Sequence, residues 1–366
     1  MPELVVSRRL RRTPFAEAVE AHGPRSYTVY NHMLLPMGYR DPVEDYHHLK
    51  EAVQLWDVAC ERQVELRGRD AAKLMQWLTP RDLSKLTIGG CAYVPICDER
   101  GGMLNDPVAL KLAEDRFWIS IADSDLLFWV NGLARGAGLE VEVFEPDVSP
   151  LAVQGPKAEA LMVRLFGEAI RELKFYRFAR FGWQGRDWLI SRSGFSKQGG
   201  FEIYVEGAEQ GMPLWSALWE AGQDLDIRPG SPTTIERIEG GLLSYGSDMT
   251  REDTPFHAGL GRFCHLDRVP GCIGHAALSK VVADGPDRQI RAIEVAGEVP
   301  VIAEAWPLLA GDRRVGQVTS IAKSPMVGTN VAIGMVAESH WGGGTELVCL
   351  TPDGPRDALV REKFWN

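Results

Sequence analysis

A glycine-rich turn that runs directly into an alternating strand is the feature that most constrains this chain. Residues 193–202 read Ser-Gly-Phe-Ser-Lys-Gln-Gly-Gly-Phe-Glu, and the strand pattern continues through Val205. Alternation places Glu202 and Tyr204 on the face opposite Ile203. The glycines allow the backbone to approach a flat ligand closely, and a carboxylate beside them can accept paired N–H donors from a ring. The segment therefore predicts a sheet that carries a ligand site on one face.

Length and charge narrow the class of protein. The 366 residues suffice for two or three modules. A net charge of −10 argues against nucleic acid and anionic membranes as partners, because both require a basic surface. No stretch approaches the roughly 20 apolar residues of a membrane span, and the N-terminus lacks a signal-peptide core. These features predict a cytoplasmic protein whose six cysteines are reduced, since no Cys-x-x-Cys pair occurs.

The order of predicted elements indicates an α+β fold. The N-terminal half reads as strand 62–67, helix 69–78, strands 91–97, 107–112 and 117–121, helix 124–135 and strand 139–144. This rhythm is typical of a split βαβ sheet. A second unit begins near Ser149 and contains helices 157–166 and 212–221, each bounded by Pro and Gly. After Val282 the chain is rich in strands and turns, which predicts a small barrel or sandwich.

Two further segments contain residues suited to chemistry. Residues 97–106 place a Gly-Gly turn between two strands, and Asp106 stands where the second strand begins. An Asp beside such a turn is, by itself, more often a hairpin residue than a catalyst. In residues 236–248, Arg237 fits either a structural salt bridge with a neighbouring acid or a ligand contact. Tyr245 fits the wall of a ligand pocket.

The three segments together resemble the folate-binding aminomethyltransferase family, which includes the T-protein of glycine cleavage. The corresponding family motifs are Gly-Tyr-Thr-Gly-Glu-Asp-Gly-Phe-Glu-Ile, Asn-Glu-x-Gly-Gly-x-x-Asp-Asp-Leu and Arg-Leu-Glu-Ala-Gly-x-x-x-Tyr-Gly-x-Asp. The resemblance implies a three-lobed cloverleaf with split βαβ, ferredoxin-like sheets and a small C-terminal β-barrel. The predicted lobes are discontinuous: 1–50 with 145–206 and 249–281, 51–144 with 207–248, and 282–366.

The same resemblance implies a role for individual residues. Tetrahydrofolate is the expected cofactor, Glu202 the residue that holds its pterin ring, and Asp106 the residue near N5 that is most closely tied to catalysis. The remaining predicted cofactor-binding residues are Phe195, Tyr93, Arg237 and Tyr245. Thr233 stands where the family often has an Arg for the glutamate tail of folate. How the tail is anchored is therefore left open.

Within the family, residues 27–36, 56–64 and 196–200 resemble the dimethylsulfoniopropionate demethylases. That resemblance implies transfer of a methyl group from a small sulfonium compound to N5 of tetrahydrofolate. A sulfonium is a soft cation that binds well against aromatic faces. The predicted substrate-binding residues are Tyr30, Tyr204, Trp188 and Lys197, the last to pair with a carboxylate of the donor. Phe195 stands where these enzymes tend to have Trp, which leaves room for a different methyl donor.

Two alternatives remain open. One is aminomethyltransferase activity on a lipoylated carrier protein, against which Lys197, Gln198 and Asn105 argue, because they replace family residues. The other is a folate-binding regulatory protein without chemistry, against which Asp106 argues. No metal is predicted, since neither His32 nor the adjacent His47 and His48 have a recognisable ligand spacing. The sequence does not distinguish a monomer from a homodimer.

Overall fold

A computed structural model describes residues 7–365, which group into two compact units. The first unit runs through Ala72 and adds Leu86–Ala92 and Val108–Thr233. The second comprises Lys73–Lys85, Tyr93–Pro107 and the residues from Thr234 onward. Each unit is thus assembled from separate stretches of sequence.

The first unit contains a five-stranded sheet in the order β10-β4-β9-β8-β5. Its strands are β4 (Gln63–Arg67), β5 (Cys91–Tyr93), β8 (Val108–Ala113), β9 (Arg116–Ser120) and β10 (Glu142–Phe144). Helix α4 (Leu126–Gly136) belongs to the same unit, whereas α3 (Ala71–Leu78) passes into the second unit at Lys73. β9 lies between β4 and β8 and is antiparallel to both, while β10 pairs antiparallel with the other edge of β4. This is the predicted split βαβ arrangement.

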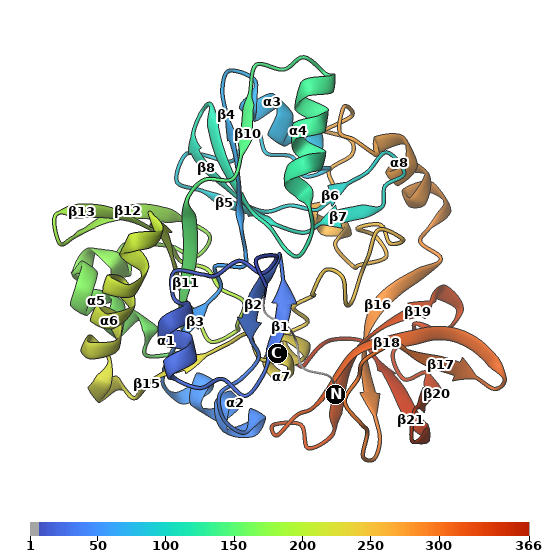
Figure 1. The fold of residues 1–366 in the computed structure, drawn as a ribbon. Helices are drawn as coiled ribbons and strands as arrows, with labels where there is room; N and C mark the ends of the chain where they lie inside the picture. Colours follow the sequence, from blue (N-terminus) through green and yellow to red (C-terminus); the bar gives the residue numbers. More distant parts are fainter. Residues whose placement is uncertain (1–6, 366) are drawn as a thin grey trace. The chain divides into compact units, whose positions relative to one another are not determined.

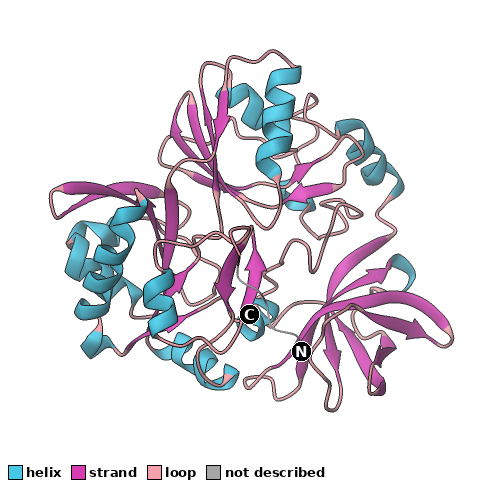
Figure 2. Ribbon diagram, viewed as in Figure 1, coloured by secondary structure: helices cyan, strands magenta, loops and turns pink. Residues whose placement is uncertain are grey.

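A six-stranded sheet in the same unit has the order β12-β13-β14-β11-β3-β15. Its strands are β3 (Val53–Asp57), β11 (Val148–Gln154), β12 (Phe178–Trp183), β13 (Arg186–Ser191), β14 (Gly200–Glu206) and β15 (Ile227–Gly230). Helices α5 (Ala158–Phe166) and α6 (Gly211–Ala221) cover one face of this sheet (Figures 1 and 2). The order β11-α5-β13-β14-α6-β15 is a second split βαβ unit.

Strand β3 interrupts that second unit. It pairs antiparallel with β11, with Asp57 opposite Leu151, and parallel with β15. The predicted lobes separate β3 from β11, so the boundary expected at residues 50 and 51 does not follow the sheet. Long-range pairing of this kind leaves no mark in local sequence, because it joins strands about ninety residues apart.

Local signals explain where the helices begin and end. α2 (Pro42–Glu51) has Pro42 in its first turn, and the side chain of Asp41 accepts a hydrogen bond from Val43 N at 2.9 Å. α5 ends at Gly167, whose φ of 80° suits a glycine C-cap. The N-terminal part of this unit also contains α1 (Ala16–Ala21) and the hairpin of β1 (Tyr27–Tyr30) with β2 (Met33–Pro36).

The second unit contains a closed barrel, β16-β19-β18-β17-β20-β21. Its strands are β16 (Arg288–Val295), β17 (Trp306–Ala310), β18 (Arg313–Lys323), β19 (Asn330–Ala337), β20 (Glu346–Thr351) and β21 (Gly354–Arg361). The unit also holds the hairpin of β6 (Ile96–Cys97) with β7 (Met103–Asn105), and helices α7 (Thr234–Glu239) and α8 (His275–Asp284). All six barrel strands fall within the predicted 282–366 segment, so the expectation of a C-terminal barrel is confirmed. Within residues 7–365 no helix combines the length and the apolar content needed to cross a membrane.

Candidate active site

Glu202 lies on the face of the six-stranded sheet that the helices do not cover. In the β13–β14 ladder Ser191 stands opposite Glu202, and Leu189 opposite Tyr204. The intervening residues Phe201, Ile203 and Val205 are buried in the core beneath α5 and α6. The alternation predicted from sequence is therefore present, with Glu202 and Tyr204 sharing one face.

Three hydroxyl groups surround the Glu202 carboxyl. Ser193 Oγ donates a short hydrogen bond to Oε2, Ser191 Oγ donates to the same oxygen at 3.4 Å, and Tyr204 Oη does so at 3.5 Å. Burial raises the pKa of Glu202, and the hydrogen bonds from Ser193, Ser191 and Tyr204 oppose that rise. Neither serine is among the site residues predicted from the sequence, although Ser193 opens the glycine-rich segment itself.

The glycine-rich loop before β14 is held by Gln154 of β11. The Gln154 side chain donates to Ser193 O at 3.2 Å and accepts from Ser196 Oγ at 2.8 Å. A Cβ on Gly194, whose φ is 155°, would lie 2.2 Å from that Gln154 amide, so only glycine fits there. Phe195, partly buried, and Lys197, exposed, are carried on this loop. Phe195 and Lys197 therefore lie on the loop that leads directly into the strand of Glu202.

The predicted substrate-binding aromatics fall in different places. Tyr204 is 1% exposed and its ring lies 5.9 Å from that of Trp118. Tyr30 ends β1 and packs in a small cluster with Met33, Leu35 and Cys60. Trp188 lies on the opposite, helix-covered face, 2% exposed, and donates from Nε1 to Trp183 O at 3.1 Å. Trp188 is therefore a core residue, and we do not include it in the site.

In the second unit, Asp106 directly follows β7. Its Oδ2 accepts a hydrogen bond of 2.7 Å from Tyr93 Oη. Burial raises the pKa of Asp106 to about 7, and the Tyr93 hydrogen bond works against that rise. The turn before β7 is tightly packed, since a Cβ on Gly102 would lie 2.2 Å from the carbonyl oxygen of Arg251. Asp106 is thus a carboxyl that Tyr93 holds by a hydrogen bond and whose pKa burial raises to about 7.

Tyr245 lies in the same neighbourhood as Asp106. Its hydroxyl donates to Met103 O at 2.9 Å, three residues before Asp106. Burial, and after it the charge of Asp106, raises the pKa of Tyr245. The structure therefore brings the predicted residues Tyr93, Asp106 and Tyr245 together.

Arg237 of α7 is engaged by the protein itself. Its guanidinium donates to Asp248 Oδ2 and to Ser320 Oγ, both at 2.7 Å. Asp248 is fully buried and also accepts hydrogen bonds from the hydroxyls of Thr319 and Ser320 at Oδ1. Of the two interpretations left open by the sequence, this geometry favours the structural salt bridge, which joins α7 to barrel strand β18.

Models of two protein domains match the chain. The model described as the GCVT N-terminal domain matches residues 15–268, and that of the glycine cleavage T-protein C-terminal barrel domain matches residues 288–364. The chain belongs to the glycine cleavage T-protein family. The family predicted from the sequence is thereby confirmed.

Individual members of the T-protein family are similar over nearly the whole chain. The dimethylsulfoniopropionate demethylase DmdA of Ruegeria pomeroyi is 57% identical over 366 residues, which covers 100% of both chains. An aminomethyltransferase of Symbiobacterium thermophilum is 32% identical and 92% of each chain is covered. The crystal structure of the glycine cleavage system aminomethyltransferase T from Bartonella henselae matches with a TM-score of 0.87, 25% identity and 98% coverage of both chains. The predicted fold class is therefore confirmed.

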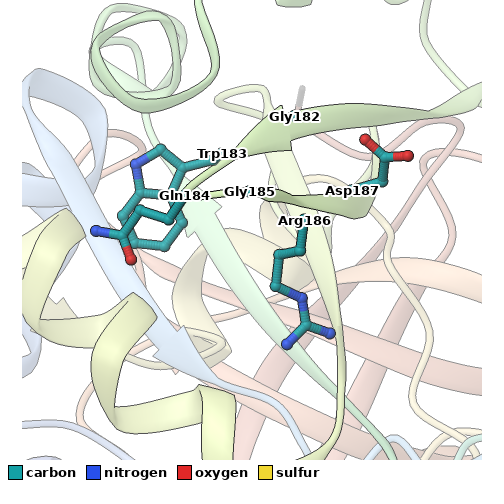
Figure 3. A pocket seen from close by; sticks show the side chains of 6 residues that line it. All are labelled: Gly182, Trp183, Gln184, Gly185, Arg186 and Asp187. Carbon is teal, nitrogen blue, oxygen red and sulfur yellow. The ribbon is translucent and has the colours of Figure 1, made fainter.

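One further hollow lies away from the predicted site residues of this T-protein family chain. A hollow of about 430 Å³ lies at the tip of the β12–β13 hairpin (Figure 3). It is lined by Gly182, Trp183, Gln184, Gly185, Arg186 and Asp187. None of these residues belongs to the predicted site. Within residues 7–365, no three His, Cys, Asp or Glu side chains are grouped so that they could hold a metal ion.

Proposed function

We propose that this chain is a tetrahydrofolate-dependent methyltransferase that demethylates dimethylsulfoniopropionate. The 57% identity to DmdA over the full length of both chains carries the proposal. A methyl carbon leaves sulfur and bonds to N5, sulfur keeps the electron pair, and the N5 proton is released. The products are 3-methylthiopropionate and 5-methyltetrahydrofolate. Nothing is oxidised or reduced.

The residues around Glu202 fit a pterin ring. Tetrahydrofolate supplies the amine nucleophile, N5, and a ring edge with adjacent N–H donors. Glu202 provides the matching acceptor, on a sheet face that is free of covering helices. Phe195, on the loop just before β14, is placed to add an apolar surface. We assign Glu202 to ring recognition on these grounds.

Asp106 is suited to the proton and charge changes of the reaction. A sulfonium leaves as a neutral sulfide, so no acid is needed to activate it. What the transfer needs is alignment of the reacting atoms and stabilisation of the positive charge that develops on the amine. Ionised Asp106 can stabilise that charge and then accept the proton, because its pKa is about 7. Tyr93, which donates to Asp106 Oδ2, fixes the direction of the carboxyl.

The methyl donor requires an aromatic and a cationic contact. A cation over an aromatic face gains about 0.5–2 kcal/mol. Tyr30 and Tyr204 are the remaining candidates for this contact, and Lys197 for the carboxylate of the donor. Lys197 is exposed on its loop, where a small anion could reach it. We further propose a cytoplasmic monomer or homodimer without a metal, for which light scattering distinguishes the two oligomeric states.

The direct test is anaerobic incubation of the protein with tetrahydrofolate and dimethylsulfoniopropionate, followed by mass spectrometry of 5-methyltetrahydrofolate. We expect product from the wild type and almost none from Asp106→Ala, while Asp187→Ala, at an exposed hairpin position, behaves as wild type. Absence of product, with folate still bound, would exclude this donor. Turnover that depends on a lipoylated carrier would instead support the aminomethyltransferase alternative, which the Symbiobacterium relative favours.

A further inference from the structure

The three hydroxyls around Glu202 all reach the same oxygen. Ser193, Ser191 and Tyr204 each donate toward Oε2. Ser191 is 0% exposed and Ser193 6%, so both serines sit inside the protein. An arrangement that directs every donor to one oxygen fixes the rotation of the carboxyl and leaves Oε1 as the oxygen available to a ligand.

We propose that Ser193, supported by Ser191, is a positioning residue that turns Oε2 of Glu202 into the protein, stabilises the carboxylate through its hydrogen bond and so presents Oε1 to the N–H donors of the pterin ring. This inference rests on the proposed function, because it takes the folate ring as the ligand of Glu202. It gives a role in ligand binding to Ser191 and Ser193, which take no part in the proposed methyl transfer itself.

The strand geometry explains why both serines are needed. Ser191 stands directly opposite Glu202 in the ladder, and Ser193 lies just beyond the end of β13. The two serine hydroxyls share a short hydrogen bond. The single proton of Ser191 can be directed either to Oε2 of Glu202 at 3.4 Å or to Ser193. When Ser191 donates to Ser193, the Ser193 proton becomes a stronger donor to the carboxylate. Gln154 holds the Ser193 carbonyl from β11 and thereby fixes the position of the hydroxyl.

The other groups that face Glu202 do not favour its ionised form as strongly. Burial raises the pKa of the Cys91 thiol in β5, and the nearby charge of Glu202 raises it further. Tyr204 is influenced both by Glu202 and by Glu61, and its pKa is raised chiefly by burial. The interactions that lower the pKa of Glu202 are the hydrogen bonds from Ser193, then Ser191, then Tyr204. Loss of the Ser193 hydroxyl should therefore have the largest effect.

The first test titrates Glu202 without any ligand. Infrared difference spectra across a pH series would report its protonated carboxyl, with Glu202→Gln identifying the band. In Ser193→Ala we expect the midpoint to rise by about one pH unit, because the ionised carboxyl loses a charge-assisted hydrogen bond. Ser191→Ala should give a smaller rise. Ser196→Ala is the matched control, because that hydroxyl donates to Gln154 and not to Glu202. An unchanged midpoint in Ser193→Ala would overturn the proposal.

The second test measures tetrahydrofolate affinity across the same pH range. Ser193→Ala should bind about tenfold more weakly at the acidic end and approach the wild type at the alkaline end, where the carboxyl is ionised in both proteins. Ser193→Thr, which keeps a hydroxyl, should restore the wild-type pH dependence. Equal weakening at every pH would indicate a merely structural serine.

The two proposals fail in different ways. A wild type that binds no tetrahydrofolate contradicts the proposed function and the ligand part of this inference together. The carboxyl titration still decides whether Ser193 controls Glu202. A wild type that binds folate with the expected pH dependence, yet forms no 5-methyltetrahydrofolate, contradicts only the reaction.

Discussion

At the scale of single residues, the hydrogen bond between Tyr93 and Asp106 should set the pH at which turnover begins. If ionised Asp106 is the active form, kcat rises with pH through about 7, the pKa that burial gives this carboxyl. Tyr93→Phe removes a hydrogen bond that favours the ionised form. We therefore expect its kcat profile to move to higher pH while the plateau is largely retained.

Tyr245→Phe provides the control for that experiment. The Tyr245 hydroxyl donates to the carbonyl of Met103 rather than to the carboxyl. Its removal should leave the midpoint of the kcat profile near that of the wild type. A midpoint that does not move in Tyr93→Phe would show that Asp106 is not the group that limits turnover at low pH.

Asp106 should also reduce stability above neutral pH. Its pKa is about 7 in the folded protein against an ordinary value of 3.8. Between these pH values the folded state holds a proton that the unfolded state has released, so the free energy of unfolding falls as pH rises through this range. Asp106→Asn avoids that loss. In urea unfolding we expect the variant to exceed the wild type by at most a few kcal/mol near pH 8, and by less near pH 5. An equal difference at both pH values would contradict this.

Removal of the Glu202 charge should weaken folate binding selectively. Glu202→Gln keeps the shape of the side chain but loses the charged acceptor, and a hydrogen bond to a charged group is worth about 1.5–3 kcal/mol. The dissociation constant for tetrahydrofolate should therefore rise about tenfold or more. Glu209→Gln, an exposed residue on the short helix after β14, is the matched control. An unchanged constant in Glu202→Gln would remove Glu202 from the site.

At the scale of elements, the buried salt bridge of Arg237 in α7, which also reaches Ser320 of β18, should contribute to the stability of the fold and not to folate binding. Asp248→Asn leaves the largely buried Arg237 without its counter-charge, and breaking such a pair typically costs about 3–5 kcal/mol. We expect a lower thermal midpoint with an unchanged dissociation constant for folate. Asp224→Asn, in the exposed pair with Arg164, should leave the midpoint unchanged. Weaker folate binding at unchanged stability would instead make Arg237 a ligand.

The elements predicted from the sequence are mostly those whose ends are marked by local chemistry. Gly167 marks the end of the predicted helix 157–166, which the structure contains as α5. The alternation around Glu202 also predicts its face correctly, because strand period is a local property. Trp188 lies on the helix-covered face, and this depends on the register of β13 against β14, which residues 186–191 do not encode. Ser191 was overlooked for the same reason: its importance comes from standing opposite Glu202.

At the scale of the whole molecule, the sequence predicts the family and the class of fold but not how the segments divide. The insertion of β3 between β11 and β15 joins residues that the predicted lobes separate. Likewise, Leu86–Ala92 belongs to the first compact unit and Tyr93–Pro107 to the second, although these stretches are adjacent in sequence. How the chain divides into structural units depends on long-range packing. The order of the motifs along the sequence is therefore compatible with several divisions.

The C-terminal segment offers a test of one predicted lobe. Residues 282–366 contain every strand of the closed barrel, and a closed barrel leaves no unpaired edge. Its interior core, which includes Trp306, Leu308 and Val318, is drawn entirely from this segment. We therefore expect the isolated fragment to fold, with a cooperative thermal transition and dispersed amide signals in NMR spectra.

The same fragment should nevertheless be prone to self-association. Ile290, Ile333 and Met335 belong to a second cluster that also contains Cys97 and Met103, which the fragment lacks. Cutting the chain exposes these apolar side chains, and exposed apolar patches promote association. Light scattering should show oligomers that Ile333→Ser and Met335→Gln reduce, while the thermal transition persists. A fragment with random-coil spectra would show that the barrel depends on the rest of the second unit, and the predicted boundary at residue 282 would then be wrong.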